Sequence, residues 1–91
     1  MTGSEYIERV KSSRCVICWH RLSVNISPCD AHHVGLGEER DDFLVAALCK
    51  QHHQGATGVH HLHRKGFERM WKVTPMMLVS WTIQEVMRGS P

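Results

Sequence analysis

Long apolar runs are absent from this 91-residue sequence, and aromatic residues make up only 7% of it. No stretch approaches the roughly 18 uninterrupted apolar residues of a membrane-spanning helix, so we expect no such span. No apolar run follows the first four residues, so we expect no signal peptide and a cytoplasmic location. Repeats, low-complexity tracts and long linkers are also missing, which favours a single domain over residues 1–91.

Net charge is also low, formally +2 with neutral histidines, which by itself indicates only a weak attraction to nucleic acid. What the chain has in quantity is metal-binding side chains, with four cysteines and eight histidines. A domain of this size buries a modest apolar core, so a further stabilising device is expected. In the cytoplasm, cysteines at metal-ligand spacing favour zinc over disulfides.

Two pairs of these side chains have the same two-residue gap, Cys15 with Cys18 and Cys49 with His52. A turn with two residues between its ligands directs both ligands to one point. Two such turns complete the tetrahedral shell of a structural Zn²⁺. Ordinary buried cysteines are the competing interpretation, and the matched gaps favour zinc. The remaining cysteine, Cys29, is interpreted as a packing residue.

Hydrophobic periodicity predicts a short helix, a β-hairpin and further helices. The predicted segments are, in order, a helix over 4–12, strands over 22–26 and 31–34, a strand or helix start over 43–48, and helices over 62–73 and 75–87. Thr74 followed by Pro75 provides the last helix with an N-cap and a first residue. That helix has a broad apolar face, which either closes over the core or meets a partner, so both a monomer and a homodimer remain open.

The zinc shell leaves several histidines unassigned, among them His32, His33 and His53. Neighbouring residues in a strand point to opposite faces, so one of His32 and His33 is free to face a metal while the other faces a different target. His53 directly follows the zinc ligand His52, so the zinc would position it. A site of this kind leaves coordination positions open, as hydrolysis requires.

Taken together, these motifs resemble the HNH endonuclease superfamily, the ββα-metal nucleases. The matching stretches are Cys15-x-x-Cys18, His32-His33-Val34, Asp42, Leu48-Cys49-x-x-His52-His53 and Gly58-Val59-His60. Many members bind zinc with two Cys-x-x-Cys pairs, and here His52 takes the place of a cysteine. The order is most similar to that of small phage-encoded HNH proteins.

The resemblance implies a fold in the α+β class, a zinc-stabilised, treble-clef-like ββα-metal core with a β-hairpin. This core would span residues 14–61, after a helix within 1–13 and before C-terminal helices within 62–91. The function that it implies is a metal-dependent endonuclease that hydrolyses DNA phosphodiester bonds, in the bacterial host cytoplasm if a phage encodes the chain. The alternative is a zinc-stabilised DNA- or protein-binding module without catalysis.

The resemblance also implies roles for single residues. His33 takes the place of the general base, and His32 and His53 take the places of metal ligands, with His60 as candidate third ligand. Their ion is expected to be Mg²⁺ or another divalent cation, which would stabilise charge on the phosphate and on the leaving 3′ oxygen. Asp42 stands where the motif has its middle Asn, and would orient the base or bind the metal.

Asp41, the residue before Asp42, is an equal candidate for the position of the motif's middle Asn. Basic residues near the site are candidate contacts to DNA phosphates: Arg40, Arg64, Lys65, Arg69 and Lys72. The last three are spaced by four and three residues, which places them on one face of the predicted helix. A solvated basic face explains the same spacing equally well.

Overall fold

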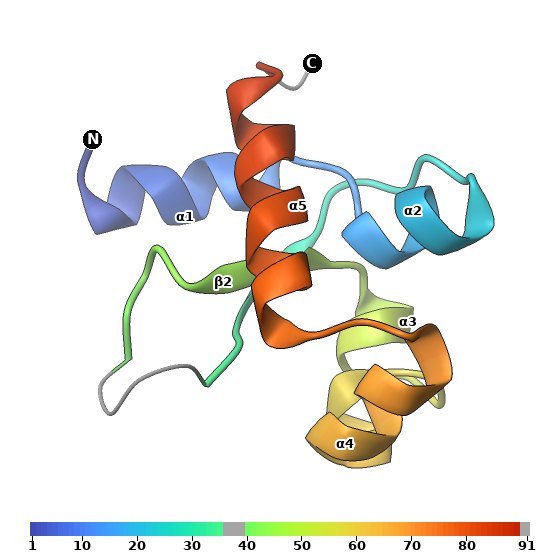
Figure 1. Cartoon of the computed structure of the whole chain (residues 1–91). Helices are drawn as coiled ribbons and strands as arrows, with labels where there is room; N and C mark the ends of the chain where they lie inside the picture. Colours follow the sequence, from blue (N-terminus) through green and yellow to red (C-terminus); the bar gives the residue numbers. More distant parts are fainter. Residues whose placement is uncertain (36–39, 90–91) are drawn as a thin grey trace.

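A two-stranded antiparallel sheet lies at the centre of the computed structural model, with helices packed around it (Figure 1). The structure describes residues 1–35 and 40–89. In chain order its elements are α1 (Gly3–Lys11), α2 (Val16–Leu22), β1 (Asp30–His33), β2 (Val45–Leu48), α3 (Lys50–His53), α4 (Val59–Trp71) and α5 (Pro75–Met87). A hairpin and helices in one small unit are the α+β arrangement that the sequence predicts.

Strand β2 is the most deeply buried element, since none of its four side chains is exposed. The ambiguous apolar run at 43–48 therefore ends in a strand, and continuous burial explains why its residues do not alternate with polar ones. Strand β1 is half-buried and pairs with it so that Asp30 lies opposite Leu48 and His33 opposite Val45. This register brings the start of β1 beside the start of α3.

Helices α1 and α5 follow the expected local rules. Thr2 and Glu5 form a capping box at the start of α1, in which each side chain bonds the backbone N–H of the other. The predicted cap of α5 is confirmed, because the Thr74 hydroxyl accepts from the Met77 N–H at 3.1 Å, with Pro75 as the first helical residue.

The strand predicted over residues 22–26 is wrong. Leu22 is the last residue of α2, and Ser23 ends the helix in the left-handed conformation at φ 57°. Leu22, Val24 and Ile26 alternate in sequence as a strand would, but all three are exposed, at 47%, 44% and 41%. Their alternation buries no face, and no β-ladder joins this stretch to either described strand.

Polar contacts hold α5 against the rest of the molecule. Arg14, before α2, makes a two-pronged ion pair with Glu85 of α5, and the two side chains are 11% and 5% exposed. Near the middle of α5 the buried Thr82 hydroxyl accepts from the Ala47 N–H of β2 at 3.0 Å and donates to the Leu78 carbonyl. In Figure 1 this helix crosses β2. Of the broad apolar face of α5, Leu78, Val79 and Val86 are buried against the core, whereas Ile83 and Met87 are exposed.

Helix α4 begins three residues before the predicted start at 62 and contains a break. His63 has φ 61° and ψ 167°, a backbone region that is essentially restricted to glycine. Lys72 ends the helix in the left-handed conformation at φ 54°. The expectation that Lys65, Arg69 and Lys72 share one helical face is thus wrong for Lys72, because it lies beyond the last helical residue.

The longest helices of the described part of the chain have 13 residues. At about 1.5 Å per residue such a helix is about 20 Å long, shorter than the roughly 30 Å apolar core of a bilayer. Within residues 1–35 and 40–89, no helix has both the length and the apolar composition to cross a membrane.

Candidate metal centres and the histidine pair

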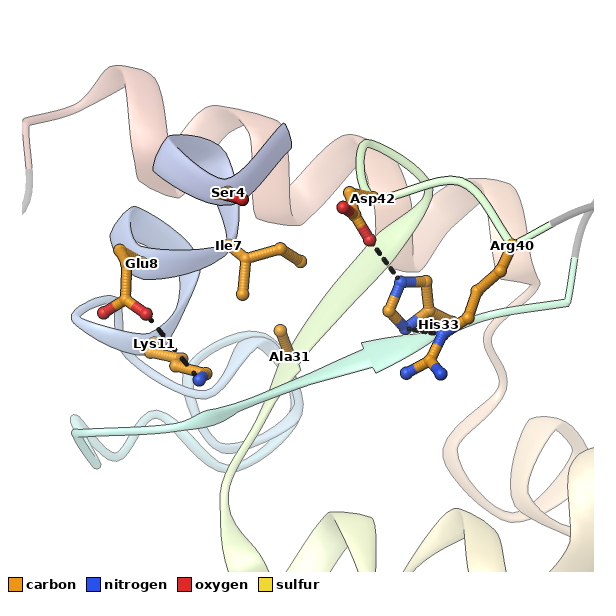
Figure 2. A pocket seen from close by; sticks show the side chains of 8 residues that line it. All are labelled: Ser4, Ile7, Glu8, Lys11, Ala31, His33, Arg40 and Asp42. Carbon is orange, nitrogen blue, oxygen red and sulfur yellow. Dashed lines mark hydrogen bonds and ion pairs between the residues drawn. The ribbon is translucent and has the colours of Figure 1, made fainter. Parts of the chain in front are cut away.

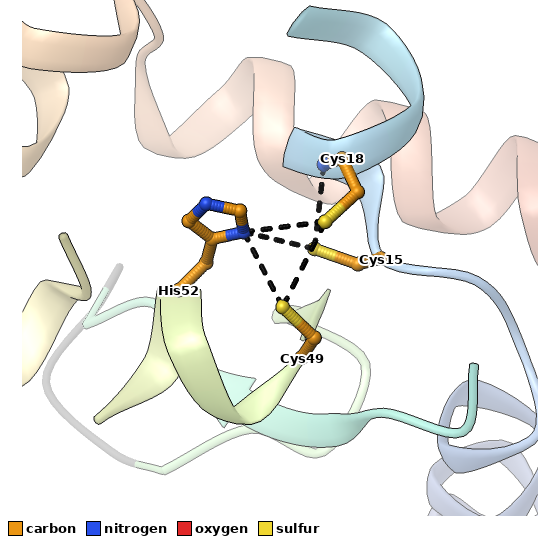
Figure 3. A group of neighbouring side chains, drawn as sticks. All are labelled: Cys15, Cys18, Cys49 and His52. Carbon is orange, nitrogen blue, oxygen red and sulfur yellow. Dashed lines mark hydrogen bonds between the residues drawn. The ribbon is translucent and has the colours of Figure 1, made fainter. Parts of the chain in front are cut away.

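The four residues of the two predicted half-sites meet at one point (Figure 3). We call this set, Cys15, Cys18, Cys49 and His52, the cysteine cluster. Cys15 is the N-cap of α2 and Cys49 the N-cap of α3, so each pair lies at the start of a helix. The first turn of each helix then places the second ligand, Cys18 or His52, beside the first. All four side chains are buried.

The distances within the cysteine cluster match a tetrahedral ion. Nδ1 of His52 lies 3.6 Å from the Cys15 sulfur, 3.4 Å from that of Cys18 and 3.3 Å from that of Cys49. The sulfurs of Cys18 and Cys49 are 3.8 Å apart. Around a tetrahedral Zn²⁺, sulfurs lie about 3.8 Å apart, and sulfur and nitrogen about 3.5 Å. The four residues are thus positioned to hold a metal ion, and the shell is compatible with structural zinc.

The chemistry of the donors also fits a cation. Burial raises the pKa of the Cys15 and Cys18 thiols, so the protein alone favours their neutral forms. A bound dication reverses this preference because it stabilises thiolates directly. Burial lowers the pKa of His52, which leaves its imidazole neutral and able to offer a lone pair. All four cysteines are free of disulfides, and Cys29 is buried outside the cluster, as a packing residue would be.

A second group of possible ligands consists of His32, His53 and His60, which we call the histidine cluster. Their ligand nitrogens all lie within 4.8 Å of one another. Nε2 of His53 and Nε2 of His60 are 3.1 Å apart. With metal–nitrogen bonds of about 2.1 Å, this separation lies between about 3.0 Å for a right angle at the ion and about 3.4 Å for a tetrahedral angle. The group is thus able to hold an ion.

The three histidines come from separate elements. His32 is on β1, His53 is the last residue of α3, and His60 is in the first turn of α4. Burial is the main cause that lowers the pKa of His32 to about 4, and the nearby His53 and His60 contribute to the same shift. Its imidazole is therefore neutral at pH 7. His60 is exposed and the other two are partly exposed. Solvent can therefore reach this cluster.

The adjacent residue His33 belongs to a different group (Figure 2). Its Nε2 lies 2.9 Å from Oδ1 of Asp42, and its Nδ1 accepts from Nε of Arg40 at 3.2 Å. A carboxylate only accepts, so Nε2 carries the proton and Nδ1 the lone pair. Of the two candidate aspartates, Asp42 contacts His33, whereas Asp41 accepts from the Phe43 N–H at 2.8 Å.

Two open hollows meet at His33, Ala31 and Arg40. One, of about 370 Å³, lies between α1 and β1 and is the hollow drawn in Figure 2. The other, of about 340 Å³, is lined on its far side by the histidine cluster. His33 borders both hollows, whereas His32 lines only the second. A ligand in the second hollow would therefore contact both histidines.

The predicted phosphate contacts occupy varied positions. Arg64, Lys65 and Arg69 are exposed on α4, and Nε of Arg64 pairs with Glu68 at 2.8 Å. Arg40 lies against His33 at the edge of both hollows. Among these predicted phosphate contacts, Arg40 is the one with a hydrogen bond to His33.

Sequence reasoning missed Asp30. Oδ2 of this residue lies 2.9 Å from Nδ1 of His53 and 3.1 Å from Nζ of Lys50. The hydrogen bond with His53 is the main cause that lowers the pKa of Asp30. The contact with Lys50 lowers it further, against the opposing effect of burial. An aspartate two residues before a candidate ligand histidine was the available signal, but its partner lies 23 residues away in the chain.

Comparison with protein-family models, with curated proteins and with solved structures gave no match.

Proposed function

We propose that this chain is a metal-dependent HNH-type endonuclease that hydrolyses phosphodiester bonds in DNA. One observation carries the proposal. The imidazole of His33, oriented by Asp42, lies on the same strand as His32 of the histidine cluster, and their two hollows meet. A base next to a metal site with open positions is the combination that phosphodiester hydrolysis requires.

His33 is the general base in this proposal. Its unprotonated Nδ1 takes a proton from the attacking water, whose oxygen bonds to phosphorus while the bond to the 3′ oxygen breaks. The leaving oxygen takes a proton from solvent. Asp42 accepts from Nε2–H, which fixes the tautomer and stabilises the imidazolium that forms.

Arg40 has two roles in this scheme. Its Nε contacts Nδ1 of His33 in the structure, so a bound phosphate that attracts the guanidinium also frees the base. The exposed Arg64, Lys65 and Arg69 on α4, together with Lys72, supply further phosphate contacts without base readout. We therefore expect DNA binding that depends strongly on salt and weakly on sequence.

The histidine cluster would hold the divalent ion. An ion there would stabilise negative charge on the phosphate and on the leaving oxygen. Three imidazole ligands suit Zn²⁺, Ni²⁺ or another transition metal, whereas Mg²⁺ prefers oxygen ligands. We therefore favour a transition metal over the Mg²⁺ named first from the resemblance. Three protein ligands also leave positions for water and phosphate.

A plasmid-nicking assay tests the proposal. Supercoiled plasmid is incubated with zinc-loaded protein and, in turn, Mg²⁺, Mn²⁺, Co²⁺, Ni²⁺ or added Zn²⁺. We expect wild type to nick the plasmid and His33→Ala to be slower by about 10²–10⁴-fold, the usual contribution of a general base. His61→Ala is the matched control, since His61 is exposed and belongs to neither cluster.

The outcomes separate the two candidate functions. If His33→Ala loses nicking while His61→Ala keeps it, the endonuclease proposal is supported. If every protein shifts DNA in a gel but none nicks it with any ion, the chain is the binding module instead. If wild type neither nicks nor shifts DNA, the endonuclease and the DNA-binding module are both wrong, and the protein-binding module is left.

A further inference from the structure

We propose that Asp30 is a positioning residue for the histidine cluster, which it serves through His53. Its carboxylate holds the His53 imidazole in the tautomer and orientation that direct Nε2 at the ion. The inference rests on the proposed function, because it requires His32, His53 and His60 to bind a metal. It adds a residue that neither the motif spacing nor the role assignments include.

The contact fixes which nitrogen of His53 is free. Oδ2 of Asp30 lies 2.9 Å from Nδ1, and because a carboxylate only accepts, Nδ1 carries the hydrogen. Nε2 then keeps its lone pair, and this is the nitrogen that lies 3.1 Å from Nε2 of His60. Asp30 therefore selects the tautomer that the histidine cluster needs.

The fold explains why Asp30 is in this place. It is the first residue of β1 and pairs with Leu48, which immediately precedes the N-cap of α3, Cys49. His53 lies one helical turn after Cys49, and its N–H donates to the Cys49 carbonyl at 2.8 Å. The sheet register thus brings Asp30 to the side of α3 where the His53 ring lies.

Two features argue for positioning over direct coordination. Asp30 contacts the nitrogen of His53 opposite the one in the cluster, and it does not belong to the group whose ligand atoms converge. Lys50 lies 3.1 Å from the same oxygen and adds a positive charge that keeps the carboxylate in place. A carboxylate behind a ligand histidine usually raises metal affinity by about 10–100-fold.

A Co²⁺ titration of the zinc-loaded protein measures this effect without an activity assay. The visible absorption of a second, nitrogen-bound Co²⁺ gives its dissociation constant, while a sulfur-to-cobalt band would report exchange at the cysteine cluster. We expect about 10–100-fold weaker binding in Asp30→Ala. We expect Asp30→Asn to fall between Ala and wild type, because its amide oxygen still accepts from Nδ1–H.

The control variant is Glu5→Gln, which removes one negative charge but keeps the capping box of α1. It should bind the second Co²⁺ as wild type does. Zinc content and the thermal unfolding midpoint of each variant show whether the fold is retained.

Wild-type protein provides a measurement that does not depend on the variants folding. Long-range ¹H–¹⁵N NMR of the zinc-loaded protein, before Co²⁺ is added, should find the hydrogen of the neutral His53 ring on Nδ1. A hydrogen on Nε2 would overturn the inference.

The remaining outcomes distinguish this inference from the proposed function. If Asp30→Ala binds the second Co²⁺ as tightly as wild type, the role of Asp30 is refuted and the histidine cluster stands. If wild type takes up no second Co²⁺, the histidine cluster is no metal site and both proposals fail. If wild type binds the ion but nicks no plasmid, the endonuclease fails and the role of Asp30 is judged by the titration alone.

Discussion

The two clusters share neighbouring residues in α3, His52 and His53, yet their surroundings differ. The cysteine cluster is buried and has three sulfur ligands, whereas the histidine cluster is partly exposed and has none. Buried thiols that need a dication to ionise are typical of a closed structural shell. Partly exposed imidazole ligands that leave coordination positions open are typical of a metal site that meets a substrate. One short helix therefore presents one ligand to the interior and the next to solvent.

The largest effect should come from breaking the buried cluster. Cys15→Ser removes one of four ligands, and binding of structural zinc in small domains is worth about 10–16 kcal/mol, comparable with the whole stability of a domain. We expect zinc content and the far-ultraviolet circular dichroism of the folded state to be lost together. Cys29→Ala is the matched control, because Cys29 is buried outside the cluster. Normal folding of Cys15→Ser without zinc would contradict the structural role.

Removal of metal in steps should separate the two clusters in one sample. A chelator added to protein loaded at both sites should take the ion from the histidine cluster first, since that site is partly exposed and has no thiolate. Unfolding should follow only at chelator concentrations higher by more than about a hundredfold, when the structural ion is lost. Metal release and circular dichroism, followed together, check the order. Release of both ions in one step would mean that the sites do not differ in this way.

A change at His53 should affect chemistry and leave the fold intact. His53→Ala removes a ligand of the histidine cluster, so we expect at least about a hundredfold loss of plasmid nicking. Because the side chain is 13% exposed and hydrogen-bonded to Asp30, the free energy of unfolding should fall by about 1–2 kcal/mol, far less than the loss of structural zinc would cost. His52→Ala is the informative neighbour, and it should lose zinc and unfold. Equal effects of the two variants would mean that His52 and His53 do not belong to separate sites.

The smallest effect concerns His63, three residues after the cluster ligand His60. Glycine adopts the backbone conformation of His63 at little cost, so His63→Gly should raise the free energy of unfolding by about 1 kcal/mol. Chemical denaturation of the zinc-loaded protein measures this difference. Second-metal affinity should stay unchanged, because His63 is exposed and outside both clusters. A destabilised variant would show that the His63 side chain makes a contribution larger than the strain.

Local sequence alone was enough to predict the cysteine cluster and the start of α5. Cys-x-x-Cys, Cys-x-x-His and Thr74-Pro75 each depend on geometry within one helical turn, which the chain encodes locally. The choice of Asp42 over Asp41 needed the structure, because only the fold decides which carboxylate reaches His33.

Other features depend on contacts between distant parts of the chain. The partner of Arg14 is Glu85, 71 residues away, and no local pattern connects them. The alternation at 22–26 suggested a strand because periodicity cannot report whether a partner strand exists. The role of Asp30 likewise depends on the β1–β2 register, which sets it beside α3.

The immediate adjacency of His52 and His53 constrains how this sequence can vary. Successive residues of a helix are rotated by about 100°, so each ligand has its direction only because no residue separates them. One residue inserted between His52 and His53 would turn the second ligand away from its cluster while the first stayed in place. One residue inserted or deleted between Cys49 and His52 would displace both. The segment from Cys49 to His53 should therefore be preserved in length among descendants that keep both sites. Substitutions at the exposed Lys50 and Gln51 can accumulate, but length changes there cannot.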